Sequence, residues 1–187
     1  TALGDSAYNL GLMDRAIESF RTSVGLVPGG WTNKNNLAAA YLGAERYEEA
    51  LDILEMSLAI TGESNFSADT HFLQAEAYRN LGNMDSFAQS MTRSLELGLS
   101  GPRAGQAHLN LGQFDMASGR FGPAIARLNE AIEINSSSPE AYALRGEIFS
   151  ESDEHRRAIQ DFEKAIQLDP DQQLDYGRLG ASYFELG

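Results

Sequence analysis

Small and apolar residues recur along the chain in a pattern that repeats about every 34 residues. Five six-residue segments read alike, the first over 15–20 and the last over 157–162, and their second residues stand at 16, 50, 87, 124 and 158. Within each unit the apolar positions fall into two stripes at helical spacing. A period of this length with two helical stripes predicts tandem pairs of helices.

Proline and glycine mark the predicted ends of these helices. Pro28 and Pro170 each follow a second helix, which a proline cannot extend. Gly11, Gly82 and Gly119 stand between the paired helices, where the turn needs a permissive backbone. The predicted helices run over 1–9, 13–26, 32–43, 47–60, 67–80, 84–97, 104–117, 121–134, 139–151, 155–168 and 173–186.

A second recurrence explains how the helices of a pair approach each other. Glycine or alanine stands in the same slot of each first helix, at Gly4, Ala38, Ala75, Gly112, Gly146 and Gly180. A small residue at a crossing lets two helix axes approach to about 8–10 Å. One such pair cannot bury its apolar face alone, so we expect neighbouring pairs to stack on one another.

The pattern resembles the tetratricopeptide repeat. The best match is the last full unit, with Tyr142, Gly146, Phe149, Ala158, Phe162, Ala165 and Pro170. The resemblance implies an all-α, right-handed superhelical α-solenoid of antiparallel helix pairs, with five repeats plus a final unpaired helix. It implies a single domain over 1–187, with repeats at approximately 1–30, 31–64, 68–101, 105–138 and 139–172 and a terminal or capping helix at 173–187. Phe87 departs from the pattern because it replaces the small residue of the second helix in its unit.

Composition and charge narrow the function. The chain has 187 residues, of which 42% are hydrophobic, and 14 basic against 27 acidic residues give a net charge of −13. This apolar fraction is close to that of globular domains. With two lysines and no basic cluster, binding to nucleic acid is not expected. No apolar run approaches the ~20 residues that cross a bilayer, so direct membrane insertion is not expected either.

No residue constellation indicates catalysis or a bound cofactor. The absence of cysteine excludes a thiolate metal site and a cysteine nucleophile. His71 and His108 occupy the same slot of successive repeats and should point the same way, so we interpret them as packing residues rather than metal ligands. The sequence therefore predicts a protein that is not an enzyme and uses no cofactor. It leaves the compartment open: cytoplasmic or, if a leader was removed, periplasmic.

The resemblance also implies a binding surface, because arrays of this family bind partners on the concave face that their first helices line. The second, fifth, sixth, ninth and twelfth residues of each unit should face it. Amides there can satisfy a peptide backbone, and apolar side chains can anchor its side chains. The predicted groove residues are Asn35, Asn36, Ala39, Asp69, Phe72, Glu76, Arg79, Gln106, Leu109, Asn110, Gln113, Met116, Glu140, Ala143, Glu147 and Ser150.

The expected function is that of a scaffold or adaptor that binds a protein or peptide segment in this groove. The acidic charge favours a neutral or basic partner. Two alternatives stay open at this point. The chain could be the substrate-recruiting repeat region of a larger enzyme, or a self-assembling scaffold that forms a homo-oligomer through the ends of its array.

Overall fold

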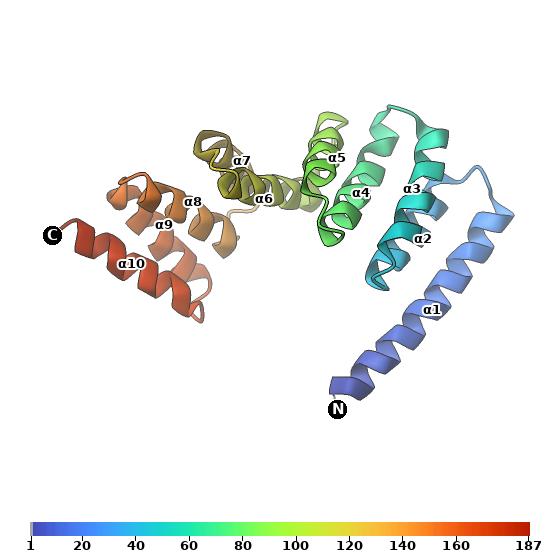
Figure 1. Cartoon of the computed structure of the whole chain (residues 1–187), viewed down its shortest axis with the longest axis horizontal. Helices are drawn as coiled ribbons and strands as arrows, with labels where there is room; N and C mark the ends of the chain where they lie inside the picture. The colour runs from blue at the N-terminus through green and yellow to red at the C-terminus, as the bar shows by residue number, and fades with distance from the viewer. Residues whose placement is uncertain (1) are drawn as a thin grey trace. The chain divides into compact units, whose positions relative to one another are not determined.

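The computed structural model describes residues 2–187, except for the side chains of residues 2–10 and of Leu174. In this part of the chain there are ten α-helices, one short 3-10 helix and no strand (Figure 1). The predicted all-α class with antiparallel helix pairs is confirmed. The helices are α1 (Ala2–Leu26), α2 (Trp31–Gly43), α3 (Tyr47–Thr61), η1 (Asn65–Ser67), α4 (Ala68–Asn80), α5 (Met84–Glu96), α6 (Gly101–Ala117), α7 (Phe121–Ile134), α8 (Pro139–Glu151), α9 (His155–Leu168) and α10 (Gln173–Glu185).

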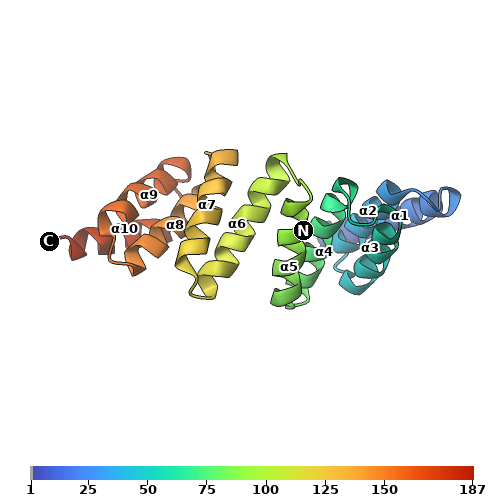
Figure 2. The ribbon, with the colours of Figure 1, turned by 90° about the horizontal axis from the view of Figure 1, so that it is seen from above.

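The chain divides into two compact units, Thr1–Leu99 (unit 1) and Ser100–Gly187 (unit 2). Unit 1 contains the hairpins α2/α3 and α4/α5, with α1 packed on α2. Unit 2 contains the hairpins α6/α7 and α8/α9, with α10 packed on α9 (Figure 2). Within each unit, each hairpin therefore packs on the next element of the chain, as the stacking argument requires.

Helix α1 differs from its prediction. It runs unbroken from Ala2 to Leu26, so the separate helices predicted over 1–9 and 13–26 are wrong. An isolated glycine inside a helix costs only about 1 kcal/mol relative to alanine, so Gly11 need not end the helix. The segment assigned to the first helix pair is thus a single helix, which packs against α2 through the buried Ile17.

All four hairpin turns contain one residue in the left-handed region. The α4/α5 and α6/α7 turns use Gly82 and Gly119, with φ values of 75° and 71°. The α2/α3 and α8/α9 turns use Glu45 and Asp153 instead, with φ values of 58° and 60°. Each turn thus reverses the chain in the same way, and only two of them use the residue that does so without steric strain.

Glycines in the first helices set the close approach of the hairpins in unit 2. A Cβ added at Gly146 would lie 2.9 Å from the Phe162 ring, and one at Gly112 would lie 2.9 Å from Leu128. Phe162 and Leu128 are fully buried. The predicted role of the small residues, to admit a large side chain of the partner helix, is confirmed at these two crossings. In unit 1, Phe87 of α5 is also buried.

Candidate functional site

A groove of about 690 Å³ lies in unit 2 across the three first helices α6, α8 and α10. We call it the unit 2 groove. Helices α7 and α9 contribute nothing to its lining. Its lining residues are Gln113, Met116, Ala117, Pro139, Glu140, Ala143, Leu144, Glu147, Gln172, Asp175 and Arg178.

The floor of the unit 2 groove is apolar. Met116 on α6 and Leu144 on α8 pack against the hydrophobic core of the unit while they line the groove. Ala143, also on α8, is largely buried. Since these side chains are held by the core beneath them, the floor offers a fixed surface to an apolar ligand group.

The start of α8 is fixed by its cap. The backbone N–H of Ala141 donates to the Ser138 hydroxyl, at 3.3 Å, and Pro139 occupies the first turn. Glu140 is exposed in the same turn, at the rim of the groove. A carboxylate at this position is favoured by the partial positive charge of the helix N-terminus. The cap therefore determines where the exposed acid of the groove stands.

An arginine and two carboxylates form the polar wall of the groove. Arg178 of α10 makes an ion pair with Glu147 of α8, and its Nη1 donates to Asp175 Oδ1 at 3.1 Å. Asp175 is only 4% exposed. Burial, and to a smaller extent the nearby Asp169, raises the pKa of the Asp175 carboxyl above its usual value. Burial also lowers the pKa of the Arg178 guanidinium.

The structure brings five of the predicted groove residues of unit 2 together. Gln113, Met116, Glu140, Ala143 and Glu147 all line the unit 2 groove. The predicted Ser150 is half-buried and lies outside the groove lining.

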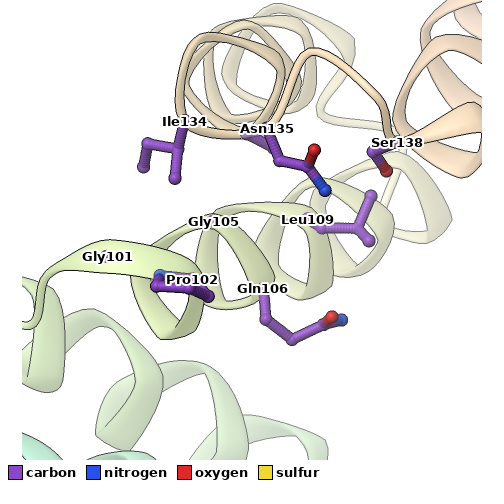
Figure 3. A pocket seen from close by; sticks show the side chains of 9 residues that line it. Gly101, Pro102, Gly105, Gln106, Leu109, Ile134, Asn135 and Ser138 are labelled. Carbon is purple, nitrogen blue, oxygen red and sulfur yellow. The ribbon is translucent and has the colours of Figure 1, made fainter.

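The other predicted residues of unit 2 lie at the start of α6. Gln106 and Leu109 line a separate pocket of about 350 Å³, which α6 and the end of α7 enclose (Figure 3). In Figure 3, Ile134 and Asn135 lie on the side of this pocket opposite the first turns of α6. Asn110 is buried, and its Oδ1 accepts from Gln106 Nε2 at 2.9 Å.

The predicted residues of unit 1 differ in exposure. Asn36, Ala39 and Arg79 are exposed, Asp69 and Glu76 are half-buried, and Phe72 is buried. Arg79 forms an ion pair with Glu76 on the same helix, at 2.8 Å.

Asn35 is placed in the interior rather than on this surface. It is 7% exposed, its Nδ2 donates to Thr70 Oγ1 at 2.9 Å, and its Oδ1 accepts from Ser57 Oγ at 2.8 Å. The amide therefore joins α2, α3 and α4 inside unit 1, and we leave Asn35 out of the proposed binding surface.

Sequence reasoning did not assign the polar wall that α10 supplies. Arg178 occupies the sixth slot of its helix, the slot of Asn36 and Asn110, so the slot rule could have found it. Asp175 occupies the third slot, which the rule does not include, and nothing in the sequence indicates its role.

His71 is buried in unit 1, and His108 is half-buried in unit 2. His71 is buried and bonded through Nδ1 to Gln74 Oε1 at 3.0 Å, and burial lowers the pKa values of His71 and His108. Among the described residues, no group of three or more His, Asp or Glu side chains could hold a metal ion. No helix in the described part of the chain has both the length and the apolarity that crossing a membrane requires.

Known proteins are similar to parts of this chain in sequence. The chain is 36% identical over 72 residues to the small glutamine-rich tetratricopeptide repeat-containing protein 2 of Mycosarcoma maydis, an alignment that covers 38% of this chain and 20% of that protein. It is 26% identical over 159 residues to the cellulose synthase operon protein C of Escherichia coli K12, covering 76% of this chain and 14% of that protein. The chain thus spans a fifth or less of the length of these relatives.

The solved structure of YrrB, described as a TPR protein with an unusual peptide-binding site, has the same fold. It superimposes with a TM-score of 0.80 at 18% identity, over 90% of this chain and 84% of that one. Models of the tetratricopeptide repeat match residues 1–68, 68–97 and 139–172. With its stacked hairpins and their glycine crossings, the chain therefore belongs to the tetratricopeptide repeat family.

Proposed function

We propose that this chain is a non-catalytic scaffold that binds an extended segment of a partner protein in the unit 2 groove. The observation that carries the proposal is the groove itself, about 690 Å³ across three successive first helices, with an apolar floor and a polar wall. Its volume falls within the range of about 300–1,000 Å³ that is typical of ligand sites. The description of YrrB as having a peptide-binding site supports the choice of a peptide.

The lining suits a peptide backbone with alternating side chains. Gln113 and Gln172 carry amides, which both donate and accept hydrogen bonds and so can match backbone N–H and C=O groups. Met116 and Leu144 supply apolar contact to the side chains that point inward. An extended segment that lies across α6, α8 and α10 would use both kinds of contact.

Charge favours a neutral or basic segment over an acidic one. The groove contains three carboxylates, Glu140, Glu147 and Asp175, and one cation, Arg178. The whole chain carries a net charge of −13. Complementary charge speeds encounter and disfavours acidic competitors, and it adds less to the affinity than the buried apolar contacts do.

The proposal is tested by mapping where a peptide binds. The probe is a pool of acetylated, amidated seven-residue peptides of alanine and leucine with one central arginine, added to the isotope-labelled full chain and followed by NMR. We expect shift changes at Gln113, Met116, Ala143 and Leu144. Shift changes confined to other surfaces, or none at millimolar peptide, would rule out the groove as the binding site.

A charge-reversed variant with a matched control sharpens this test. Glu140→Lys changes an exposed rim residue of the groove, and Glu151→Lys changes an exposed residue at the other end of the same helix, outside the groove lining. We expect Glu140→Lys to weaken binding of the arginine peptides several-fold, and Glu151→Lys to leave it within error. Equal effects of the two variants would mean that only the overall charge matters.

A further inference from the structure

Arg178 is held by acids that are less exposed than the arginine itself. The side chains of Glu147 and Asp175 are 15% and 5% exposed, against 31% for Arg178. One acid comes from α8 and the other from the turn of α10 that precedes the arginine. All three residues line the unit 2 groove, and the arginine is the most exposed of them.

From this arrangement we infer that Arg178 occupies, in the free protein, the subsite that an arginine side chain of the bound peptide takes over in the complex. The inference rests on the function proposed above and names the chemistry that the groove selects. The subsite is more than a group of acids, because it opens into a groove of about 690 Å³ and already holds a guanidinium.

The two carboxylates need a cation at this place. A buried carboxylate is costly unless it is paired, and burial already raises the pKa of Asp175. If Arg178 left without a replacement, Glu147 and Asp175 would each lose an ion-pair partner. A second guanidinium would restore the pairing, so an exchange of one for the other keeps the local charge unchanged.

The exchange of one guanidinium for another is close to balanced, because the peptide arginine gives up the hydration that Arg178 regains. A peptide also brings apolar and backbone groups that cover Met116 and Leu144, whereas Arg178 brings none. The net gain therefore comes from the rest of the peptide, and the arginine sets its register.

The geometry selects arginine over lysine. The carboxylates come from two different helices, and Arg178 contacts both of them at once. A planar guanidinium has donors spaced to bridge two carboxylates, whereas an ammonium acts as a single compact charge. A lysine peptide should accordingly bind more weakly than an arginine peptide.

The first test compares two peptides on the unaltered full chain. The probes are acetylated, amidated heptapeptides of alanine and leucine with a central arginine or with citrulline, which has the same shape and no charge. We expect the arginine peptide to bind about tenfold more tightly, as for a ligand that gains charge-assisted hydrogen bonds. The NMR signal of the Arg178 Nε–H should shift toward that of a solvated arginine with the arginine peptide and stay in place with the citrulline peptide.

The second test removes the internal occupant. Arg178→Met should tighten binding of the arginine peptide several-fold and leave the affinity for the citrulline peptide unchanged. The affinity of Arg178→Lys for the arginine peptide should lie between those of Arg178→Met and the natural chain. Arg157→Met is the control, since Arg157 is exposed and pairs with Glu154 away from the groove. Circular dichroism checks that the Arg178→Met variant keeps its helix content. If the variant loses helix, the NMR signal of the Arg178 Nε–H in the natural chain remains the test of displacement.

The outcomes separate this inference from the function on which it rests. If both peptides bind in the groove with equal affinity, or if the Arg178 signal does not move, the groove binds peptides but the arginine subsite is refuted. Weaker binding of the arginine peptide to Arg178→Met would refute it as well. If neither peptide binds, the proposed function fails and this inference fails with it.

Discussion

Units 1 and 2 are built from the same hairpins, but different chemistry fills the space beneath their first helices. In unit 1, the buried amide of Asn35 ties α2 to Ser57 of α3 and Thr70 of α4. In unit 2, Phe162 packs closely against Gly146, and the bonds between helices come from Arg145 of α8, which donates to Asp161 of α9 and to Asn129 of α7. Unit 1 thus joins three helices through a neutral buried amide, whereas unit 2 joins three helices through a partly exposed guanidinium.

The comparison shows what the position of a residue within its repeat decides. Asn35 and Ala143 occupy the same fifth slot of their repeats, yet the first is bonded in the interior and the second lines a groove. The slot fixes the face of the helix on which a side chain starts. The neighbouring helix then decides whether a partner such as Thr70 draws it inward.

The largest loss of stability is expected when the phenyl ring that packs against Gly146 in unit 2 is removed. Phe162→Ala should lower the free energy of unfolding by about 3–5 kcal/mol, since Phe162 is fully buried and leaves a cavity beside Gly146. Circular dichroism in urea should show the loss, and the fluorescence of Trp31 should report unit 1 separately, because it is the only tryptophan of the chain.

Phe184→Ala is the control for this variant. Phe184 is 82% exposed, so its truncation should change stability by no more than about 0.5 kcal/mol. If the Trp31 signal shifts as much as the circular dichroism in Phe162→Ala, the contrast between the units does not extend to their unfolding.

Removal of the buried Asn35 amide of unit 1 should cause an intermediate loss of stability. Asn35→Ala leaves Ser57 and Thr70 without their buried partner, which should cost about 1–3 kcal/mol. The urea midpoint of Trp31 fluorescence measures this loss directly. Asn36→Ala, an exposed change one residue along the same helix, should leave the midpoint almost unchanged. Equal midpoints for the two variants would contradict a stabilising role for the buried amide.

The smallest loss of stability is expected from acidification, and it should occur in both units. Burial holds the pKa values of His71 in unit 1 and His108 in unit 2 below the ordinary value of 6.5. As the pH falls below about 6.5, the unfolded chain binds protons before the folded chain does, so stability declines. Above that pH neither histidine contributes to the pH dependence.

Urea midpoints at pH 7.5 and 5.5 measure this loss. His71→Phe should reduce the decline seen by Trp31 fluorescence, which reports unit 1, and His108→Phe should leave that signal unaffected. An unchanged decline in His71→Phe would show that other groups of unit 1 govern its acid sensitivity.

Much of the fold could be predicted from spacing alone. The predicted ranges 121–134, 139–151 and 155–168 coincide with α7, α8 and α9. They do so because proline, turn residues and the small-residue slot agree about each boundary in this part of the chain. The break predicted near Gly11 is wrong because the residue type alone was used, with no second signal beside it.

The candidate site was less accessible to the same reasoning. Slot counting found Gln113, Met116 and Glu147, since it needs only the position of a residue on its helix. The pairing of Arg178 with Glu147 joins side chains of different repeats, and periodicity within one repeat contains no information about it. Arg178 is in the sixth slot of its helix and Glu147 in the ninth slot of the preceding first helix, so comparing equal slots would not have paired them either.

The lining of the unit 2 groove has a practical consequence. Only α6, α8, α10 and the residue before α10 contribute side chains to it, while α7 and α9 hold those helices at fixed separations. The side chains that face a ligand are thus encoded in alternating stretches of the polypeptide. An engineer can change the groove-facing positions on one helix at a time and leave the crossing residues and the intervening stretches untouched.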